Sequence, residues 1–330
     1  MDPIQETLFL TLYARGCDSR LPNSILNDKA SADLVQRLDY DFTRFKASPS
    51  VVSGTALRAK KIDDRVRAFC ARHPGGIVLD LGCGLDTRML RCTPPPGVDW
   101  YDVDHAEVID LRTGLLPGGH PIAADLTTEG WLDAIPADRP AMIVAEGVLP
   151  FMPGDTFRRL VRRLTRHVAS GGLVLNAYTR FAGWSMRFHP AMKALGIRGG
   201  EGFDDPREPE RWNAGLRLVE EIFLTRAPEV ASFPQPLRAL TRLTALSDGL
   251  SGRVPGSSIT GSERHTRNIP SIPRVLPDLL TVREGTLADA KHLQAVRRHG
   301  RDPRGRRRDH GRRAPGRGGR SQVPQQQLLR

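Results

Sequence analysis

The 330-residue sequence lacks the patterns that mark several classes of protein. Its four cysteines have no paired spacing of the kind that binds zinc. We interpret them as reduced thiols, predict no metal site, and expect a cytoplasmic protein. Long apolar runs are also missing: the run at residues 8–12 is too short to cross a membrane, and no basic residue precedes it. We therefore expect no membrane partner.

Most of the chain has little net charge, although the formal net charge of the whole sequence is +12. Residues 291–330 hold thirteen Lys or Arg and two Asp, so residues 1–290 carry only about one net positive charge. This tail has almost no apolar residues, and we predict that it is disordered. Such a tail could bind nucleic acid electrostatically. We favour an appendage with no role in the activity, and expect no nucleic-acid partner.

The most informative stretch that is present is Ile77–Arg88. An apolar run ends around Asp80, a turn with Gly82 and Gly84 follows, and a helical pattern begins directly afterwards. This order is typical of a buried strand that passes into a helix through a loop where a ligand touches the backbone. Asp104 ends the next apolar segment, where nucleotide sites carry a carboxylate for the ribose.

The residues around this loop favour one cofactor over another. A dinucleotide site needs a third glycine, and Thr87 stands at that position. The carboxylate of Asp80 would repel a pyrophosphate and attract a cation. S-adenosylmethionine carries an ammonium and a sulfonium group and no phosphate, so we predict S-adenosylmethionine as the cofactor. NAD-dependent oxidoreduction remains the alternative from another enzyme class.

Strand and helix patterns alternate from Gly76 onward, after a mostly helical segment at residues 3–70. Such alternation predicts an α/β fold with a mostly parallel sheet flanked by helices. The expected strands are Ile77–Leu81, Val98–Val103, Pro121–Ala124, Ala141–Ala145, Leu173–Tyr178 and Leu216–Thr225, and the expected helices are Ser31–Leu38, Ala56–Arg72, Thr87–Cys92, Glu107–Leu115, Trp131–Ile135 and Gly154–Val168.

We divide the chain by these patterns. Residues 1–75 form an N-terminal helical cover, residues 76–250 the cofactor-binding α/β core, residues 251–290 an uncertain C-terminal part of that core, and residues 291–330 the Arg-rich tail.

Four acids follow the carboxyl ends of consecutive predicted strands, where ligands of open parallel sheets bind. A ribose diol needs a bidentate acceptor, an adenine amino group needs one acceptor, and the cationic end of the cofactor needs a negative surface. The four acids are Asp80, Asp104, Asp125 and Glu146.

With these motifs the chain resembles the leucine carboxyl methyltransferase family, especially its bacterial O-methyltransferases linked to polyketide biosynthesis. The resemblance runs from about residue 8 to about residue 230. It is carried by Ser24–Asp28, Ala56–Asp63, Asp80–Arg88, Tyr101–Asp104, Ala124–Leu126 and Ala145–Met152.

The resemblance implies a Rossmann-like class I methyltransferase fold with an N-terminal helical cover. It also implies cofactor-binding roles. Arg58 would contact the methionine carboxylate, Gly82 and Gly84 would lie under the cofactor, Asp104 (or Asp102) would bind the ribose, Asp125 and Leu126 the adenine, and Glu146 would lie near the methionine amino group, with Arg15 or Arg20 as a further basic residue.

The end of the chain departs from the family pattern, in which an antiparallel hairpin closes the sheet. Leu216–Thr225 fits the first strand of this hairpin, and Leu279–Glu284 is only a weak candidate for the second. This departure keeps a non-catalytic, methyltransferase-like protein open as an alternative.

The expected function is O-methyl transfer to a carboxylate or hydroxyl of a small, polyketide-like acceptor. The acceptor would lie near residues 150–152 and 178–184, where Arg180 could orient a carboxylate and Tyr178 or His189 could assist a hydroxyl. We assign no catalytic base. Methylation of nucleic acid is disfavoured, because Glu146–Pro150 stands where amino-directed enzymes place an Asn or Asp, prolines and an aromatic residue.

Overall fold

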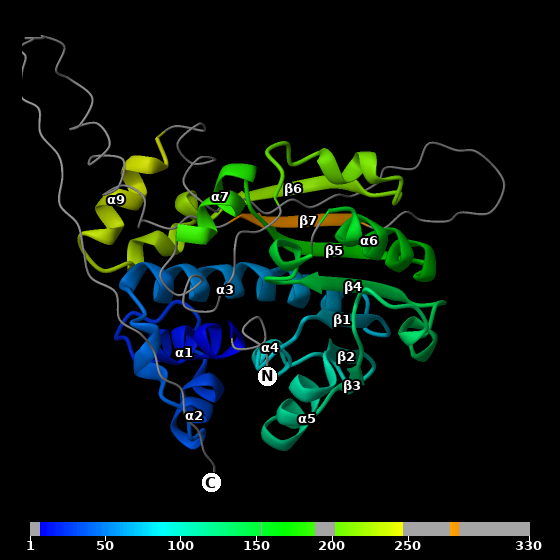
Figure 1. The fold of residues 1–330 in the computed structure, drawn as a ribbon, viewed down its shortest axis with the longest axis horizontal. Helices are drawn as coiled ribbons and strands as arrows, with labels where there is room; N and C mark the ends of the chain where they lie inside the picture. Colours follow the sequence, from blue (N-terminus) through cyan, green and yellow to red (C-terminus); the bar gives the residue numbers. More distant parts are fainter. Residues whose placement is uncertain (1–6, 153, 189–201, 247–277, 284–330) are drawn as a thin grey trace, which may run out of the picture. The chain divides into compact units, whose positions relative to one another are not determined.

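The computed structural model describes residues 7–152, 154–188, 202–246 and 278–283. Seven strands form one sheet in the order β3-β2-β1-β4-β5-β7-β6, and every pair of neighbouring strands is parallel (Figure 1). The strands are β1 (Ile77–Leu81), β2 (Asp99–Asp104), β3 (His120–Ala123), β4 (Pro140–Ala145), β5 (Ser170–Ala177), β6 (Arg217–Phe223) and β7 (Asp278–Arg283).

The predicted mostly parallel α/β fold is confirmed, and the strand order reverses at β1. The chain runs from β1 outward to β2 and β3, and then returns to β4 on the other side of β1. In open α/β sheets this reversal leaves a ligand-binding position at the carboxyl ends of the strands. The loops that follow β1, β2 and β4 meet there.

The two faces of β1 pack against different helices, because side chains alternate along a strand. Leu79 lies in the core cluster that includes Phe157 and Leu160 of α6 (Thr156–His167). Val78 lies in a second cluster with Leu57, Ile62, Val66 and Phe69 of α3 (Pro49–Arg72). Asp80, two residues after Val78, therefore faces α3.

The first residues of α3 correct one sequence prediction. The sequence pattern predicts a helix beginning at Ala56, yet the helix begins at Pro49. The Ser48 side chain accepts a hydrogen bond from the Val51 N–H, and Pro49 occupies the first turn, where its missing N–H costs nothing. These residues therefore start a helix that is two turns longer than predicted.

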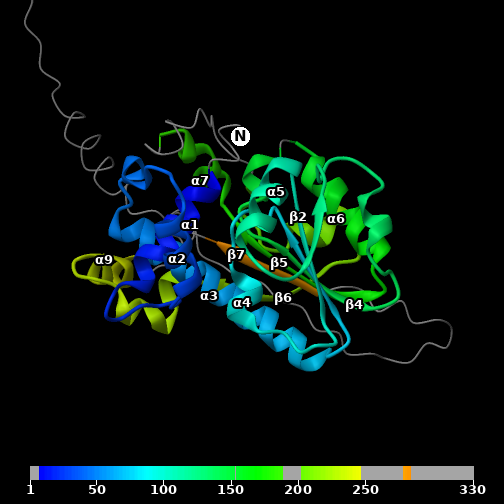
Figure 2. The same cartoon turned by 90° about the horizontal axis from the view of Figure 1, so that it is seen from below.

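The N-terminal cover consists of α1 (Thr7–Ser19), α2 (Lys29–Arg37), a 3₁₀ turn at Phe42–Phe45, and α3. Phe9 stacks on Tyr40 at 4.3 Å and meets Phe42 edge to face at 6.0 Å. Leu85, from the loop after β1, packs into the same cluster. The cover thus lies beside the loop that contains Gly82 and Gly84, which we call the glycine loop. Figure 2 shows α3 of the cover next to α4 (Arg88–Cys92), the helix that follows this loop.

Among the remaining elements, α5 (Ala106–Leu115) agrees with the helix expected over Glu107–Leu115. A 3₁₀ turn at Trp131–Ala134 stands where a helix over Trp131–Ile135 was expected, and the sequence patterns did not predict α7 (Arg180–Ser185) or α9 (Leu237–Thr244).

The last two strands depart from the expected antiparallel hairpin. β7 lies between β5 and β6 and runs parallel to both, so no antiparallel pair occurs among the strands that the structure describes. A long segment, including α9, connects β6 to β7. A hairpin needs only a tight turn, whereas a parallel pair needs a long crossover, and this chain has the crossover.

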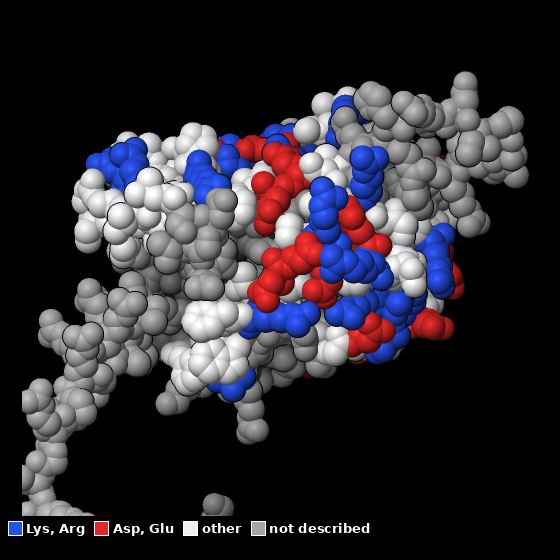
Figure 3. All heavy atoms as spheres, turned by 90° about the horizontal axis from the view of Figure 1, so that it is seen from above, with Lys and Arg blue, Asp and Glu red and all other residues white. Residues whose placement is uncertain are grey.

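Both signs of charge are mixed on the face of the molecule in Figure 3. Ion pairs join Arg158 to Glu208 at 2.9 Å and Arg162 to Asp155 at 2.8 Å. The sheet and its helices belong to one compact unit, Met1–Ala290. The Arg-rich tail, 291–330, lies outside the described residues, so its disorder remains a prediction, as do the domain boundaries proposed from the sequence.

Candidate functional site

The loop after β1 is built on two left-handed glycines. Gly82 has φ +61° and Gly84 has φ +50°, a conformation that L side chains rarely adopt. The Gly82 N–H donates to the Val103 carbonyl at 2.8 Å, which ties the loop to the end of β2. A Cβ built on Gly82 would lie 2.9 Å from Val148 Cγ2. Glycine is therefore needed here for backbone reasons, in addition to any contact with a ligand.

Asp104 ends β2 beside this loop. Its Oδ2 accepts from the Gly84 N–H and its Oδ1 from the His105 N–H, both at 2.8 Å. Burial raises the pKa of Asp104, although these two donors oppose the shift. Each carboxylate oxygen can accept a further hydrogen bond. Asp104 is thus held in a fixed orientation by backbone donors and retains acceptor capacity for a diol.

Asp102, the alternative for the ribose, lies in the interior of the same strand. Its Oδ1 accepts from Arg112 Nη2 at 2.9 Å and from the indole Nε1 of Trp100 at 3.1 Å. Asp102 is 2% exposed, and its burial raises the pKa of the carboxyl group although the positive charge of Arg112 lowers it. These contacts give Asp102 a structural role in β2.

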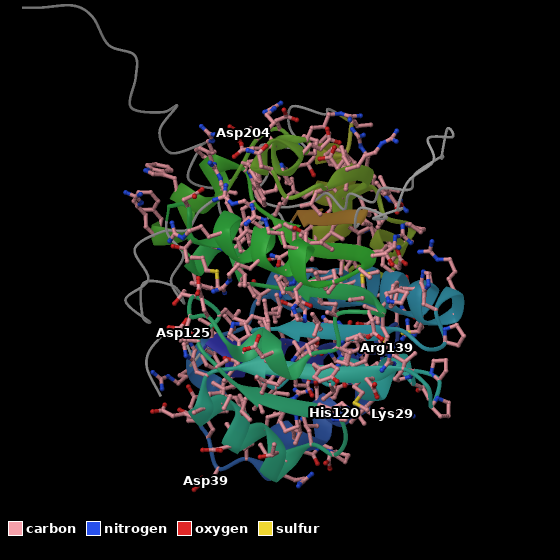
Figure 4. All side chains as sticks on the ribbon, turned by 90° about the vertical axis from the view of Figure 1, so that its right-hand side faces the viewer. Lys29, Asp39, His120, Asp125, Arg139 and Asp204 are labelled. Carbon is pink, nitrogen blue, oxygen red and sulfur yellow. The ribbon has the colours of Figure 1, made fainter. Side chains whose placement is uncertain are left out.

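Asp125 and Leu126 follow β3 in a tight turn. The Thr127 N–H donates to Asp125 Oδ1 at 2.8 Å, and this bond lowers the pKa of Asp125. Asp125 is exposed, while Leu126 is buried in the core cluster that contains α6. Figure 4 shows Asp125 at the carboxyl ends of the strands, and His120 and Arg139 at the opposite end.

Arg58 and Glu146 form a buried ion pair at this carboxyl edge. Arg58, from α3, donates through Nε to Glu146 Oε1 at 2.6 Å. Burial alone would raise the pKa of Glu146, but Arg58 and Arg88 outweigh it and the pKa is lowered. Tyr178, just past β5, is half-buried with its phenol beside Arg58, and desolvation raises the pKa of the phenol. Two predicted cofactor residues from distant segments are thus in direct contact.

Asp80 has a different environment from the one that its sequence position suggested. Both of its oxygens accept from Arg88 Nη1, at 3.1 and 2.8 Å, and the residue is 2% exposed. Burial, reinforced by Asp86 and Asp102, outweighs Arg88 and raises the pKa of Asp80 to about 7. Because an arginine already pairs with this carboxylate, the electrostatic argument that Asp80 by itself selects a cationic cofactor is weakened.

Arg88 lies at the centre of a buried ionic network that the sequence prediction did not contain. Its guanidinium pairs with Asp63 at 3.0 Å, with Asp80, with Asp86 at 3.0 Å, and with Glu146. These acids come from α3, β1, the glycine loop and the residue after β4. One arginine therefore joins the helical cover to the sheet and to a predicted cofactor residue.

Other buried pairs extend this network to α1 and α2. Arg91 pairs with Asp63 at 2.7 Å and with Asp28 at 2.9 Å, and Arg15 Nη2 donates to the Leu85 carbonyl at 3.2 Å. Arg15 is 2% exposed, whereas Arg20, the other candidate for a basic N-terminal residue, is exposed. The sequence did contain a signal for this ionic network, because three of its members lie in motifs that carry the family resemblance: Asp28, Asp63 and Arg88.

The predicted acceptor residues are spread over several environments. Pro150 and Met152 are buried, and Arg180 is exposed with its guanidinium 3.4 Å from Glu208. Phe181 and Trp184 are exposed and lie 5.7 Å apart between ring centroids. His189 lies outside the described residues. These positions leave the acceptor residues as a prediction.

The geometry fits the predicted cofactor. A carboxylate with acceptor capacity (Asp104), a loop of left-handed glycines and a buried guanidinium (Arg58) occur together where the strand order reverses. Among the described residues, no cluster of three His, Cys, Asp or Glu has the geometry to hold a metal ion. None of the described helices combines the length and apolar character needed to span a membrane.

Comparison with known proteins agrees with this geometry. A family model described as leucine carboxyl methyltransferase matches residues 9–165. The tetracenomycin polyketide synthesis O-methyltransferase TcmP of Streptomyces glaucescens is 38% identical over 234 residues, covering 69% of this chain and 86% of that protein. The S-adenosyl-L-methionine-dependent methyltransferase dpfgK of Gibberella zeae is 32% identical over 246 residues, covering 67% of this chain and 82% of that protein.

Among solved structures, an O-methyltransferase family protein from Burkholderia thailandensis matches with a TM-score of 0.36 and 16% identity. The match covers 56% of this chain and 58% of that one.

Proposed function

Because this chain belongs to the leucine carboxyl methyltransferase family and is an S-adenosylmethionine-dependent methyltransferase, we propose that it methylates a carboxylate or hydroxyl oxygen of a small, polyketide-like acceptor. The acceptor class is supported by the similarity to TcmP, which is described as an O-methyltransferase of tetracenomycin polyketide synthesis.

The observation that carries the proposal is the arrangement of Asp104, the glycine loop and the Arg58–Glu146 pair at one edge of the sheet. In the proposed site Asp104 accepts from the ribose hydroxyls, and Arg58 binds the methionine carboxylate with its guanidinium fork. Glu146 lies beside Arg58 and would accept from the methionine amino group. Asp125 and Leu126 would hold the adenine, over the turn that follows β3.

Bound S-adenosylmethionine supplies an electrophilic methyl group on a good leaving group. The chain itself needs mainly to align the acceptor oxygen and to exclude water. An acceptor carboxylate is ionised at neutral pH and requires no general base, whereas a phenol or alcohol requires one. In the proposed site Arg180 would orient a carboxylate, and Tyr178 is the candidate to assist a hydroxyl.

Calorimetric titration with S-adenosylhomocysteine, S-adenosylmethionine and NAD tests the cofactor part of this proposal. We expect both sulfur compounds to bind and NAD not to bind. Tight binding of NAD alone would overturn it.

The acceptor is tested separately by a methylation screen against aromatic and aliphatic carboxylic acids and their hydroxylated analogues. We expect methyl ester or methyl ether formation with at least one aromatic member. Methyl transfer to nucleic acid but to none of these small molecules would overturn the proposed acceptor class.

A further inference from the structure

Helix α6 contacts the turn that follows β3 through the guanidinium of Arg163. Arg163 Nη2 donates to the Leu126 carbonyl at 2.6 Å, and Nη1 donates to the carbonyls of Thr127, at 3.5 Å, and Thr128. One side chain thus binds three consecutive peptide carbonyls, because the N–H donors of a guanidinium are spread over a rigid planar fork and span a wider set of acceptors than a compact ammonium does. None of these contacts was visible in the sequence, because Arg163 follows the turn by more than thirty residues.

The other hydrogen bonds of the Asp125–Thr128 segment are accepted by Asp125 itself, and the preceding Ala124 N–H donates to the Asp104 carbonyl at 2.8 Å. The Thr127 N–H donates to Asp125 Oδ1 at 2.8 Å, and the Thr128 N–H donates to the Asp125 carbonyl at 3.0 Å, so these bonds are internal to the turn. Leu126 and Trp131 pack into the same core cluster as Phe157 and Leu160 of α6. Apolar packing fixes how deep the turn lies, and directional hydrogen bonds from Arg163 fix how its peptide groups point.

The contacts of Arg163 point to an indirect role in binding. Its guanidinium is already engaged with the peptide carbonyls of the turn, and it lies close enough to Asp125 for its charge to lower the pKa of that carboxyl group. We propose that Arg163 is a positioning residue that orients the Asp125–Thr128 turn for the adenosine end of the cofactor. This inference rests on the proposed cofactor site, in which Asp125 and Leu126 hold the adenine.

The experiment is a calorimetric titration of wild-type protein and the Arg163→Gln variant with S-adenosylhomocysteine and with adenosine. We expect the variant to bind both ligands about tenfold more weakly, the size of effect for losing one charged hydrogen-bonding group. Steady-state methylation should show a KM for S-adenosylmethionine raised by a similar factor, with kcat at saturating cofactor unchanged. KM should change without kcat because Arg163 orients a turn that binds the cofactor and does not contact the reacting atoms.

Two further variants serve as controls. Arg159→Gln removes an arginine of the same helix whose side chain is 62% exposed and pairs only loosely with Asp155, at 4.0 Å, so both affinities should stay at the wild-type value. Arg58→Gln should weaken S-adenosylhomocysteine and leave adenosine nearly unchanged, because adenosine has no methionine carboxylate. The two variants separate an effect on the adenosine end from a general loss of the site.

The outcomes separate this inference from the proposed function. Failure of wild-type protein to bind S-adenosylhomocysteine would overturn both. Binding by wild type with unchanged affinities in Arg163→Gln, or a loss for S-adenosylhomocysteine without one for adenosine, would overturn the role of Arg163 alone. If Arg163→Gln is unfolded by circular dichroism, Arg163→Lys decides: weaker binding of both ligands supports the inference, and wild-type affinity for both overturns it.

Discussion

The acidic side chains in the two halves of the candidate site have different partners. On the side of β1 and β4, Asp80 and Glu146 pair with buried arginines. On the side of β2 and β3, Asp104 and Asp125 accept hydrogen bonds from backbone N–H groups of adjacent turns. In sequence all four acids occupy equivalent places near strand ends, so their position alone does not reveal this difference.

The comparison teaches that the partner of an acid, more than its place in the fold, determines what it can do. A carboxylate held by backbone donors keeps some acceptor capacity for a ligand. A carboxylate paired with a buried arginine is expensive to separate from it, because either charge left alone in the interior is strongly destabilising. We therefore expect substitutions on the β1–β4 side to loosen the cover from the sheet, in addition to any effect of Glu146 on the methionine end of the cofactor. Substitutions on the β2–β3 side should act mainly on ligand affinity.

Arg88→Met should have the largest effect, since it leaves Asp63, Asp80 and Glu146 without their shared partner. We expect a loss of about 3–5 kcal/mol in the free energy of unfolding. Urea denaturation at pH 7 measures it, and Arg159→Met on α6 is the control, with an expected change within about 0.5 kcal/mol. A loss below about 1 kcal/mol for Arg88→Met would contradict the structural role of the network.

Asp104→Ala should act mainly on binding. We expect S-adenosylhomocysteine affinity to fall by about 1–3 kcal/mol, the range for losing a charged hydrogen-bond partner. Asp102→Ala is the contrasting variant: it removes the acceptor of Arg112 Nη2 and of the Trp100 indole N–H, and should lower the melting temperature more than the affinity. Unchanged affinity in Asp104→Ala would return the ribose role to Asp102.

The pH dependence of stability offers a test of Asp80. Its pKa is raised from the ordinary value of 3.8 to about 7, so the folded protein holds this proton more tightly than the unfolded chain. The stabilisation that protonated Asp80 contributes to the folded state is fully present below about pH 4. It is lost as the pH rises to 7, and the free energy of unfolding falls by at most about 1.4 kcal/mol per pH unit. The Asp80→Asn variant cannot titrate there.

The stability of the wild type relative to Asp80→Asn should therefore decline between pH 4 and pH 7 and be constant above it. Urea denaturation of both proteins at intervals of one pH unit measures this difference. A difference that does not change with pH would show that Asp80 stays ionised throughout.

Asp125→Asn should have the smallest effect of the four. Asparagine can still accept from the Thr127 N–H, and the residue is exposed, so the turn should survive. We expect a loss of about 0.5–1.5 kcal/mol in S-adenosylhomocysteine affinity and no change in melting temperature. Calorimetry alongside thermal denaturation checks both, and a larger fall in stability than in affinity would place Asp125 with the structural acids.

The sequence was sufficient for the sheet because strands and helices leave local periodic signals. The strands around Leu79 and Ile143 could be placed because each is a short apolar run beside a turn. The place of β7 could not be predicted, since it depends on a crossover whose path no local pattern specifies. Even so, Leu279–Glu284 was recognised as a candidate strand.

The site was predictable in position and less so in its contacts. Asp104 and Glu146 could be placed at the carboxyl edge, because parallel strands bring their ends together. That Arg88 would pair with Asp63 depends on how α3 packs against β1, which is a tertiary property. The same reason applies to Arg163, which meets Leu126 only after α6 has packed on the sheet.

The most direct test of the account is a crystal structure with S-adenosylhomocysteine bound. We predict that the ribose hydroxyls donate to Asp104, that the adenine lies over the turn at Asp125, and that Arg88 still binds Asp80. A ribose bound elsewhere, or an Asp80 released from Arg88 to contact the ligand, would contradict the division between structural and ligand-binding acids.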